Sequence, residues 1–207
     1  MSVVVSVNVG RPRPAAWTTI GRTSIDKTAV TGPVAVGPLG LEGDEVSNHR
    51  HHGGPAKAVY AFAREDLDRW AEAFGLPVPD GMFGENLTTR GLDVNGAEIG
   101  ERWRIGDPVG DHAVVEVTMF RTPCQTFKAW LGRNGYDDRA WVRRFAQDLR
   151  PGAYLRVVVP GSIQVGDPIE VVHRPGTGVT VSSWFAEVLS PGTPSSQVPV
   201  PAKPSVI

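Results

Sequence analysis

The chain has 207 residues, and its 21 basic and 22 acidic side chains nearly cancel. That balance provides no broad field to recruit a nucleic acid polymer or an anionic membrane. Cys124 is the only cysteine, which excludes an intramolecular disulfide, an all-cysteine iron–sulfur cluster and a cysteine-rich zinc site. The opening run SVVVSVNV is too short to span a bilayer and lacks the basic leader and cleavage site of a signal peptide, so we expect a cytoplasmic protein.

Short segments rich in Val and Ile, separated by Gly and Pro, are typical of many short strands joined by turns. The candidate strands cover residues 2–9, 33–37, 56–63, 98–105, 113–120, 153–159 and 168–173. Helical periodicity marks residues 64–75, 126–132, 137–149 and 180–189, the first of which stops at Gly75. This pattern predicts a predominantly β α+β domain, and such short strands usually close into a barrel that hides their edges.

The chain is expected to have three parts. The main domain covers residues 1–175, and a short helical appendage covers residues 176–190. The remaining segment, residues 191–207, is rich in Pro and Ser and is predicted to be a disordered tail, because it has little apolar surface to bury.

The segment HRHHGG at 49–54 contains three histidines within four residues, with Asp44 nearby. Such a group is one way to ligate zinc or iron. The alternative is a polar loop, because a loop does not hold histidines in the fixed geometry that a helix provides and paired glycines permit a turn with positive φ. A Gly-Gly turn beside His52 and Lys57 also suits a nest of backbone N–H groups, which fits a phosphate better than a cation.

Two further segments carry polar groups that are candidates for a site. Glu85 and Asn86 lie in the glycine-bounded segment MFGENLTTRG. A surface loop or strand-edge cap is as compatible with this composition as a set of donors and acceptors aimed at a heteroaromatic ligand. Lys27 ends the segment TSIDK near an expected strand end, where a solvated lysine is the simpler interpretation.

Cys124 lies in the segment FRTPCQTF. Pro123 fixes its own φ and biases Thr122 toward an extended conformation, so the cysteine is expected at a rigid strand exit. Arg121 stands three residues away, and a nearby guanidinium favours the thiolate, the form that ligates metals and attacks electrophiles. A small buried hydrophobic side chain is the alternative role for a lone cysteine.

Taken in order, several of these segments resemble the MOSC domain proteins, named after the C-terminal domain of molybdenum cofactor sulfurase. The resemblance rests on SVNVG, TSIDK, HHGGPAKAVYAF, FGENLTTRGL, FRTPC and AYLRVVVPGSIQVGDPI. It runs from about Val3 to Val172 and is strongest toward the stand-alone bacterial group that includes the N-hydroxylaminopurine reductases. It implies a β-barrel-like domain that binds the pyranopterin molybdenum cofactor.

The resemblance also implies roles for individual residues. Cys124 matches the cysteine of the family's R-x-P-C motif and would be the catalytic residue that supplies a thiolate ligand to molybdenum. A second set would hold the cofactor's phosphate or pterin edge or line the same pocket: Arg121, Thr122, Lys57, His52, Gly53, Gly54, Lys27, Asn86 and Glu85.

The activity that the resemblance implies is reduction of N-hydroxylated compounds such as hydroxylaminopurines, hydroxylamines and amidoximes. The alternative is a carrier that passes on the cofactor or a Cys124 persulfide without turnover, since both functions use the same cysteine. A zinc hydrolase at His49–His52 is a third hypothesis. No aminotransferase-like cysteine desulfurase domain precedes the matched region, so we expect a function independent of pyridoxal phosphate. A homodimer is also expected, although the C-terminal helical segment is shorter than in the family.

A reductase with this sequence would need an external electron donor. The nearest candidate for a nicotinamide-binding turn, GPLGLEG at 37–43, runs into a polar loop and not into a helix. The sequence has no C-x-x-C-H motif for haem attachment. We therefore expect a separate flavoprotein reductase, ferredoxin or cytochrome to deliver electrons.

Overall fold

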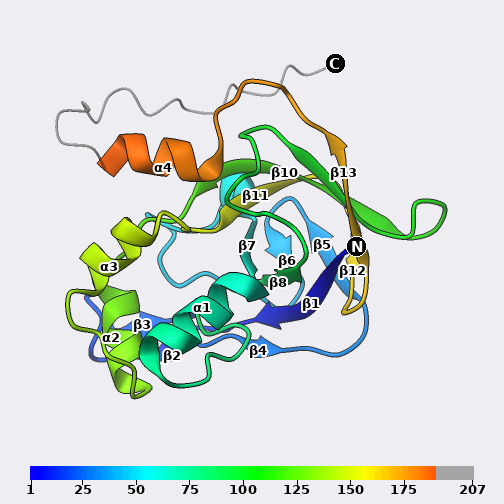
Figure 1. The fold of residues 1–207 in the computed structure, drawn as a ribbon. Coiled ribbons are helices and arrows are strands. Elements are labelled where there is room, and N and C mark those ends of the chain that lie inside the picture. Colours follow the sequence, from blue (N-terminus) through cyan, green and yellow to red (C-terminus); the bar gives the residue numbers. More distant parts are fainter. Residues whose placement is uncertain (190–207) are drawn as a thin grey trace.

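The structure is a computed structural model that describes residues 1–189, so the tail predicted at 191–207 lies outside the described residues. Within the described part, a ring of strands closes into a barrel in the order β13-β9-β10-β11-β7-β8-β1, and the pairing of β1 with β13 completes the ring (Figure 1). The barrel strands are β1 (Ser2–Val9), β7 (Val59–Ala63), β8 (Leu87–Arg90), β9 (Arg102–Gly106), β10 (His112–Phe120), β11 (Ala153–Val159) and β13 (Pro168–His173). The predicted fold class, a predominantly β α+β domain with a barrel, is confirmed.

The pairing pattern follows from the connections. Every pairing around the barrel is antiparallel except that of β7 with β8, which is parallel. Parallel neighbours need a long crossover, and here the crossover carries α1 (Arg64–Phe74). The crossover segment between α1 and β8 passes the end of the barrel at which the site lies.

Shorter strands lie outside the ring. A two-stranded hairpin pairs β2 (Arg13–Pro14) with β3 (Arg22–Thr23), and we call residues 13–23 the 13–23 hairpin. The very short β4 (Thr28–Ala29) pairs with the end of β1. A small second sheet consists of β5 (Val34–Gly37), β6 (Gly40–Leu41) and β12 (Gly161–Ile163).

The helices match the predicted segments with shifts at their ends. α1 stops at Gly75, which adopts the left-handed conformation with φ 67° and donates its N–H back to the last turn, as predicted. α2 covers Gln125–Arg133, α4 covers Val181–Leu189, and a short 3-10 turn, η1, covers Pro55–Lys57 where the start of a strand was expected. No helix within residues 1–189 is long and apolar enough to cross a bilayer.

The start of α3 was predicted wrongly. The helix was expected from residue 137 but covers Trp141–Asp148. Asp137 instead accepts hydrogen bonds from the backbone and the guanidinium of Arg139, and Ala140 adopts a left-handed conformation with φ 50°. Acidic residues suit a helix start, but here they close a turn ahead of it.

Aromatic packing fixes the helices against the barrel. The ring of Trp141 on α3 lies 4.8 Å from that of Trp70 on α1 and 5.0 Å from that of Phe127 on α2, centroid to centroid. Phe127 and Trp141 are fully buried. Burying an aromatic ring of this kind stabilises a fold by a few kcal/mol (~3–5 kcal/mol lost on truncation to Ala). The first turn of α2, which follows Cys124 directly, is therefore anchored firmly.

Candidate functional site

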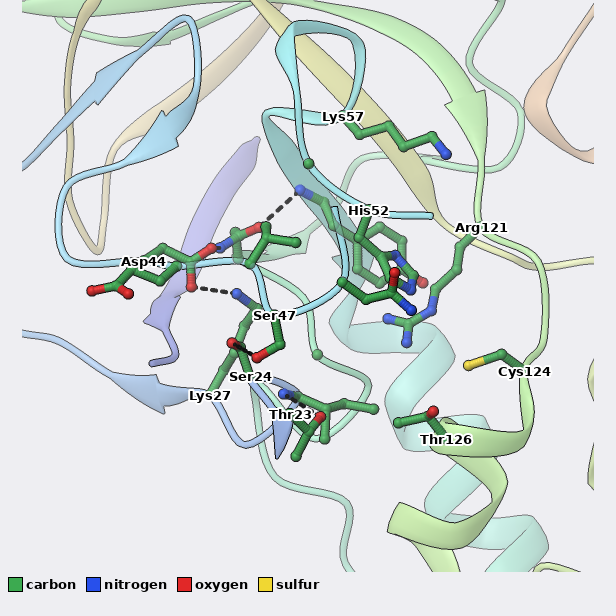
Figure 2. Close-up of a pocket in the computed structure, with 18 of the residues that line it drawn as sticks. Thr23, Ser24, Lys27, Asp44, Ser47, His52, Lys57, Arg121, Cys124 and Thr126 are labelled. Atoms are coloured by element: carbon green, nitrogen blue, oxygen red, sulfur yellow. Dashed lines mark hydrogen bonds and ion pairs between the residues drawn. The ribbon is translucent and has the colours of Figure 1, made fainter. Parts of the chain in front are cut away.

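A cavity opens at the end of the barrel beside α2, with about 820 Å³ of empty space counting its open mouth. Four parts of the chain enclose it: the 13–23 hairpin, the 44–53 loop, the barrel strands β7 and β11, and the start of α2. Figure 2 shows the sulfur of Cys124 directed toward the same central space as the guanidinium of Arg121. The predicted site residues that line the cavity are Lys27, His52, Gly53, Lys57, Asn86, Arg121 and Cys124.

Three predicted site residues do not line the cavity. Thr122 is exposed on the loop between β10 and α2, and Gly54 lies one residue beyond the lining Gly53. Glu85 is completely buried behind the wall.

Cys124 is the N-cap of α2. Its backbone is extended, with φ −137° and ψ 162°, and its Sγ accepts a hydrogen bond from the N–H of Phe127 at 3.4 Å. The first N–H groups of a helix carry partial positive charge, so the sulfur lies in a region of positive potential. The side chain is half-buried and reaches the cavity. Cys124 therefore follows the end of β10, as predicted, and it also caps the first turn of α2.

Arg121 forms part of the cavity wall and is only 5% exposed. Its Nη1 donates to the carbonyl of Phe83, and its guanidinium lies 5.1 Å from the ring centre of Tyr60 and 4.9 Å from that of Phe127. Its Nε has no hydrogen-bond partner among the described residues. Because buried donors are nearly always satisfied, the guanidinium keeps donor capacity at the cavity wall that no described residue uses.

Lys27 is neutralised inside the protein. Its Nζ forms an ion pair with Oδ1 of Asp44, and both side chains are more than nine-tenths buried. Asp44 also accepts hydrogen bonds from the N–H of Gly10 at 2.7 Å and from Nδ2 of Asn86 at 2.9 Å. Burial lowers the pKa of Lys27, although Asp44 opposes that shift. Asp44 therefore organises this corner of the cavity, and the net charge that Lys27 offers a ligand is small.

His52 and Tyr154 share a hydrogen bond of 2.8 Å between Nδ1 and the hydroxyl. Burial, together with the cations Arg121 and Lys57, lowers the pKa of His52 to about 3, so the ring is neutral at physiological pH. Lys57 donates to the carbonyl of His51 at 2.8 Å, and partial burial lowers its pKa. Gly53 and the next residue adopt positive φ values of 74° and 78°, as the Gly-Gly turn predicted.

The zinc hypothesis for residues 49–52 is wrong. His49 and His51 are exposed, and His52 turns inward to Tyr154. Within residues 1–189, no three His, Cys, Asp or Glu side chains are grouped so that they could hold a metal ion. Asp44, the nearby carboxylate of that hypothesis, is already paired with Lys27.

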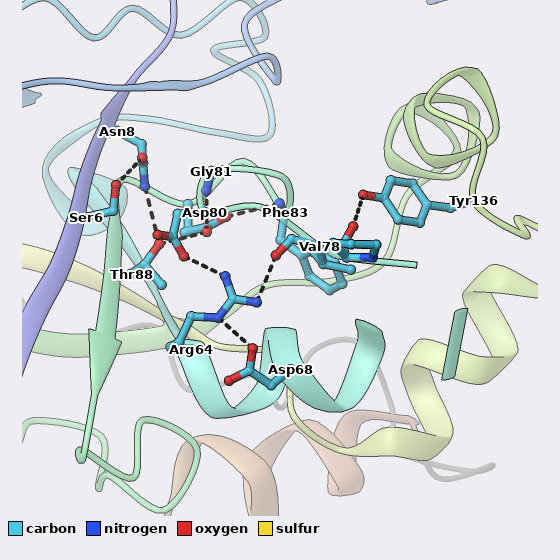
Figure 3. A network of polar contacts seen from close by, with 12 residues as sticks. Ser6, Asn8, Arg64, Asp68, Val78, Asp80, Gly81, Phe83, Thr88 and Tyr136 are labelled. Atoms are coloured by element: carbon cyan, nitrogen blue, oxygen red, sulfur yellow. Dashed lines mark hydrogen bonds and ion pairs between the residues drawn. The ribbon is translucent and has the colours of Figure 1, made fainter. Parts of the chain in front are cut away.

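Glu85 holds the wall from behind. Its carboxylate accepts hydrogen bonds from the N–H of Gly81 at 2.6 Å, the N–H of Phe83 at 3.0 Å and the hydroxyl of Thr88 at 2.9 Å. Figure 3 shows this segment together with Arg64, which bridges Asp68, Asp80 and the carbonyl of Val78. Burial raises the pKa of Glu85 to about 7. Glu85 thus holds Phe83, whose carbonyl accepts from Arg121, and does not itself line the cavity.

Several lining residues were not predicted. Ser24 and Ser47 share a hydrogen bond of 2.6 Å between their hydroxyls, and Tyr60 donates to the carbonyl of Pro151 at 2.7 Å. Tyr60 and Tyr154 pair directly across β7 and β11. Both tyrosines occur inside strongly apolar strands, where the sequence gives no sign that one face meets a cavity.

The lining chemistry fits an anionic ligand that also carries a soft metal. Lys57 and Arg121 are cationic groups without a carboxylate partner within the described part of the chain, and His52 is neutral. Asp44 and Glu45 are the acidic lining residues, and Asp44 is neutralised. A single thiol faces the same space, and thiolates suit soft metal centres.

Comparison with known proteins gives a consistent result. The model of the MOSC domain matches residues 48–170. Uncharacterized protein YflK from Bacillus subtilis is 31% identical over 181 residues, which cover 86% of this chain and 76% of YflK. Protein YiiM from Escherichia coli is 31% identical over 160 residues, which cover 73% of this chain and 65% of YiiM. A protein named Reductase from Gibberella moniliformis is 29% identical over 180 residues, which cover 84% of this chain but only 30% of that reductase.

Solved structures show the same fold. The crystal structure of YiiM from Geobacillus stearothermophilus superposes with a TM-score of 0.71 and 28% identity, covering 92% of this chain and 87% of that chain. The structure of YiiM from Escherichia coli superposes with a TM-score of 0.65 and 27% identity, covering 90% of this chain and 76% of that chain.

Proposed function

The chain belongs to the MOSC domain family, and from this membership we propose that it binds the pyranopterin molybdenum cofactor in the cavity. We further propose that it acts as a reductase of N-hydroxylated compounds such as hydroxylaminopurines, hydroxylamines and amidoximes. One observation carries the proposal: the sulfur of Cys124 and the guanidinium of Arg121 line the same cavity (Figure 2). The pair offers a ligand for a soft metal next to a donor for an anion.

Each group in the cavity would have a distinct role. Cys124 would supply the thiolate ligand to molybdenum. Arg121, Lys57 and the backbone N–H groups at Gly53 would hold the phosphate or pterin edge, since guanidinium, ammonium and nest N–H groups all bind such oxygens. The bound cofactor supplies two-electron redox chemistry at the metal.

Other residues would keep these groups in place. Asp44 neutralises Lys27 and orients Asn86, whose Oδ1 accepts from the N–H of Tyr60 at 3.1 Å. The buried rings of Tyr60 and Tyr154 would exclude water from the inner wall, and the neutral ring of His52 would add no charge beside the ligand. This arrangement would keep the inner cavity dry and positively charged, which strengthens electrostatic contacts to an anion.

The reductase activity is supported by one relative. The Gibberella moniliformis protein named Reductase matches most of this chain, while the chain spans less than a third of that protein. We therefore assign a reductase activity to this chain as a proposal, because the name describes the whole fungal protein.

The test is Cys124→Ser in protein produced in a host that synthesises the cofactor. We expect the variant to fold, to lose molybdenum and to lose reduction of an N-hydroxylated base driven by a reduced viologen dye, because no second cysteine replaces the thiolate. Thr122→Ala is the matched control, since Thr122 is exposed in the same loop and does not line the cavity. Full activity in Cys124→Ser would refute the assignment. Loss of activity with the cofactor retained would favour the carrier alternative.

A further inference from the structure

Ion pairing of the arginines is uneven over the surface. Most arginines have a carboxylate partner: Arg13, Arg64, Arg69, Arg102, Arg104, Arg139, Arg144, Arg150, Arg156 and Arg174. Within residues 1–189, a second group makes no ion pair: Arg11, Arg22, Arg50, Arg90, Arg121, Arg133 and Arg143. Arg121 belongs to the cavity wall. The other six members of this second group are exposed.

Three of them lie on the elements that enclose the cavity, namely the 13–23 hairpin, the 44–53 loop and α2, and we call them the mouth arginines. Arg22 lines the mouth itself. Arg50 is exposed between Asn48 and His52, both of which line the cavity. Arg133, at the end of α2, lies 5.4 Å from the ring centre of Trp17 on the 13–23 hairpin.

The mouth also has an apolar centre. Ile20 lines the mouth and is 43% exposed, and Trp17 is half-buried behind it on the same hairpin. Figure 1 shows β2 and β3 beside α2, in agreement with the contact between Trp17 and Arg133. Arginines and aromatic side chains are enriched in protein-docking surfaces, and both occur on these elements beside the exposed Ile20.

The positive charge around the mouth is opposite in sign to the net charge of the chain. The net charge of the protein is −1, yet Glu45 is the one exposed carboxylate among the residues that line the cavity in the described part of the chain. A cofactor phosphate does not explain this surplus, because Arg121 and Lys57 already serve the inner cavity while the mouth arginines are exposed to solvent. The mouth arginines therefore present three positive charges that form no ion pair within the described residues, beside the single exposed lining carboxylate of Glu45.

We propose that the mouth arginines and Ile20 form the docking surface for a small acidic electron-carrier protein that holds a flavin or an iron–sulfur cluster. This inference rests on the proposed function, since a reductase of this sequence needs an external electron donor. Electrostatic complementarity accelerates such encounters and makes them sensitive to salt. A carrier seated over the mouth would also place its redox group nearest to the cavity.

The stoichiometry of the reaction determines how many carrier molecules must dock for each substrate. Two electrons and two protons convert R–NHOH to R–NH₂ and water, with cleavage of the N–O bond. A carrier that gives one electron per encounter is oxidised once each time, so two reduced carriers must dock in turn for each substrate. Fast dissociation is therefore as important as binding, which suits a surface based on exposed charge.

The test compares Arg50→Glu/Arg133→Glu with Arg90→Glu in the cofactor-loaded protein. Arg90 is the matched control, because it is also exposed and without an ion pair but lies at the end of β8 away from Asn86. We expect the double variant to lose about tenfold in kcat/KM with reduced flavodoxin or ferredoxin, and to keep its rate with reduced viologen dye. Arg90→Glu should keep both rates. Arg50→Glu alone, a change at an exposed side chain, should give a smaller loss in the same direction.

A binding measurement on cofactor-free protein gives a second, independent readout. Titration calorimetry with flavodoxin or ferredoxin should show an affinity that falls with salt and falls further in the double variant. An equal loss of dye-driven and carrier-driven rates would mean that the mouth arginines act on substrate or cofactor, and would overturn the proposal. Unchanged carrier-driven rates would overturn it as well. The two proposals fail in different ways. The proposed function is contradicted if the wild-type protein holds molybdenum but does not turn over with dye. The docking surface is contradicted if carrier binding does not depend on salt.

Discussion

At the scale of single residues, the site combines groups that the sequence marks with groups that only the fold reveals. Cys124 stands out because it is alone and follows Pro123, and the structure places its sulfur at a cavity. The role of Asp44 could not be predicted, because its partner Lys27 lies 17 residues away and only the closed fold buries the two together. Glu85 was expected to line the cavity, but its side chain is buried behind the wall. A motif gives the position of a residue along the chain but not the direction in which its side chain points.

The three histidines of the 44–53 loop should differ sharply in sensitivity. His49→Ala and His51→Ala change exposed side chains, so each should alter stability by less than about 0.5 kcal/mol. His52→Ala leaves the buried hydroxyl of Tyr154 without its partner and should cost roughly 1–3 kcal/mol. Chemical denaturation, with molybdenum content measured on the same samples, checks this order. Equal effects for His49→Ala and His52→Ala would contradict it.

At the scale of elements, periodicity predicted the strands at 2–9, 153–159 and 168–173 at their observed ends. β8 is missing from the predicted strands, because its buried Thr88 and Thr89 lack the apolar character that marks a strand. Those threonines are buried through packing against β1 and β7, which is tertiary information. The strand expected at 98–105 begins later, at Arg102, because the residues before it form a turn, Glu101 N–H donating to the carbonyl of Glu98.

The turn before β8 depends on Gly81. Gly81 and Gly135 both have φ of +83°, but a Cβ at Gly81 would lie 2.9 Å from the carbonyl oxygen of Lys27, whereas one at Gly135 meets nothing within 4 Å. Gly135→Ala should cost roughly 1–2 kcal/mol for the left-handed backbone alone. Gly81→Ala should cost clearly more, because rigid backbone blocks the new methyl group. Thermal unfolding of the two variants side by side measures the difference, and equal melting temperatures would show that the turn yields freely.

The same turn should make stability depend on pH through Glu85. Burial raises the pKa of this carboxyl from 4.5 to about 7, so the folded state holds the proton more tightly than the unfolded chain. Its contribution to stability is fully present below about pH 4.5 and is lost as the pH rises to about 7, on the order of 3 kcal/mol. Urea unfolding at pH 5 and pH 8 should show this loss in the wild type and in Glu42→Gln, an exposed control. In Glu85→Gln the loss should be much smaller, and a pH response equal to that of the wild type would assign it to other groups.

At the scale of the whole molecule, the sequence indicated a barrel because many short strands need closure to hide their edges. The closing pair, β1 with β13, joins residues such as Ser2 and Ile169 from opposite ends of the chain, and no local pattern reveals such a register. The cavity likewise arises only when the 13–23 hairpin, the 44–53 loop and α2 meet. The molecule thus separates a closed barrel from the connections that form most of the candidate site, as is common where loops bear function.

The central claim is that this cavity holds a molybdenum cofactor through Cys124. Its most direct test is elemental and pterin analysis of the wild-type protein and Cys124→Ser, purified from a host that synthesises the cofactor. We predict stoichiometric molybdenum and pterin in the wild type, with neither retained in Cys124→Ser. Wild-type protein that contains neither, or a serine variant that retains both in full, would contradict the account.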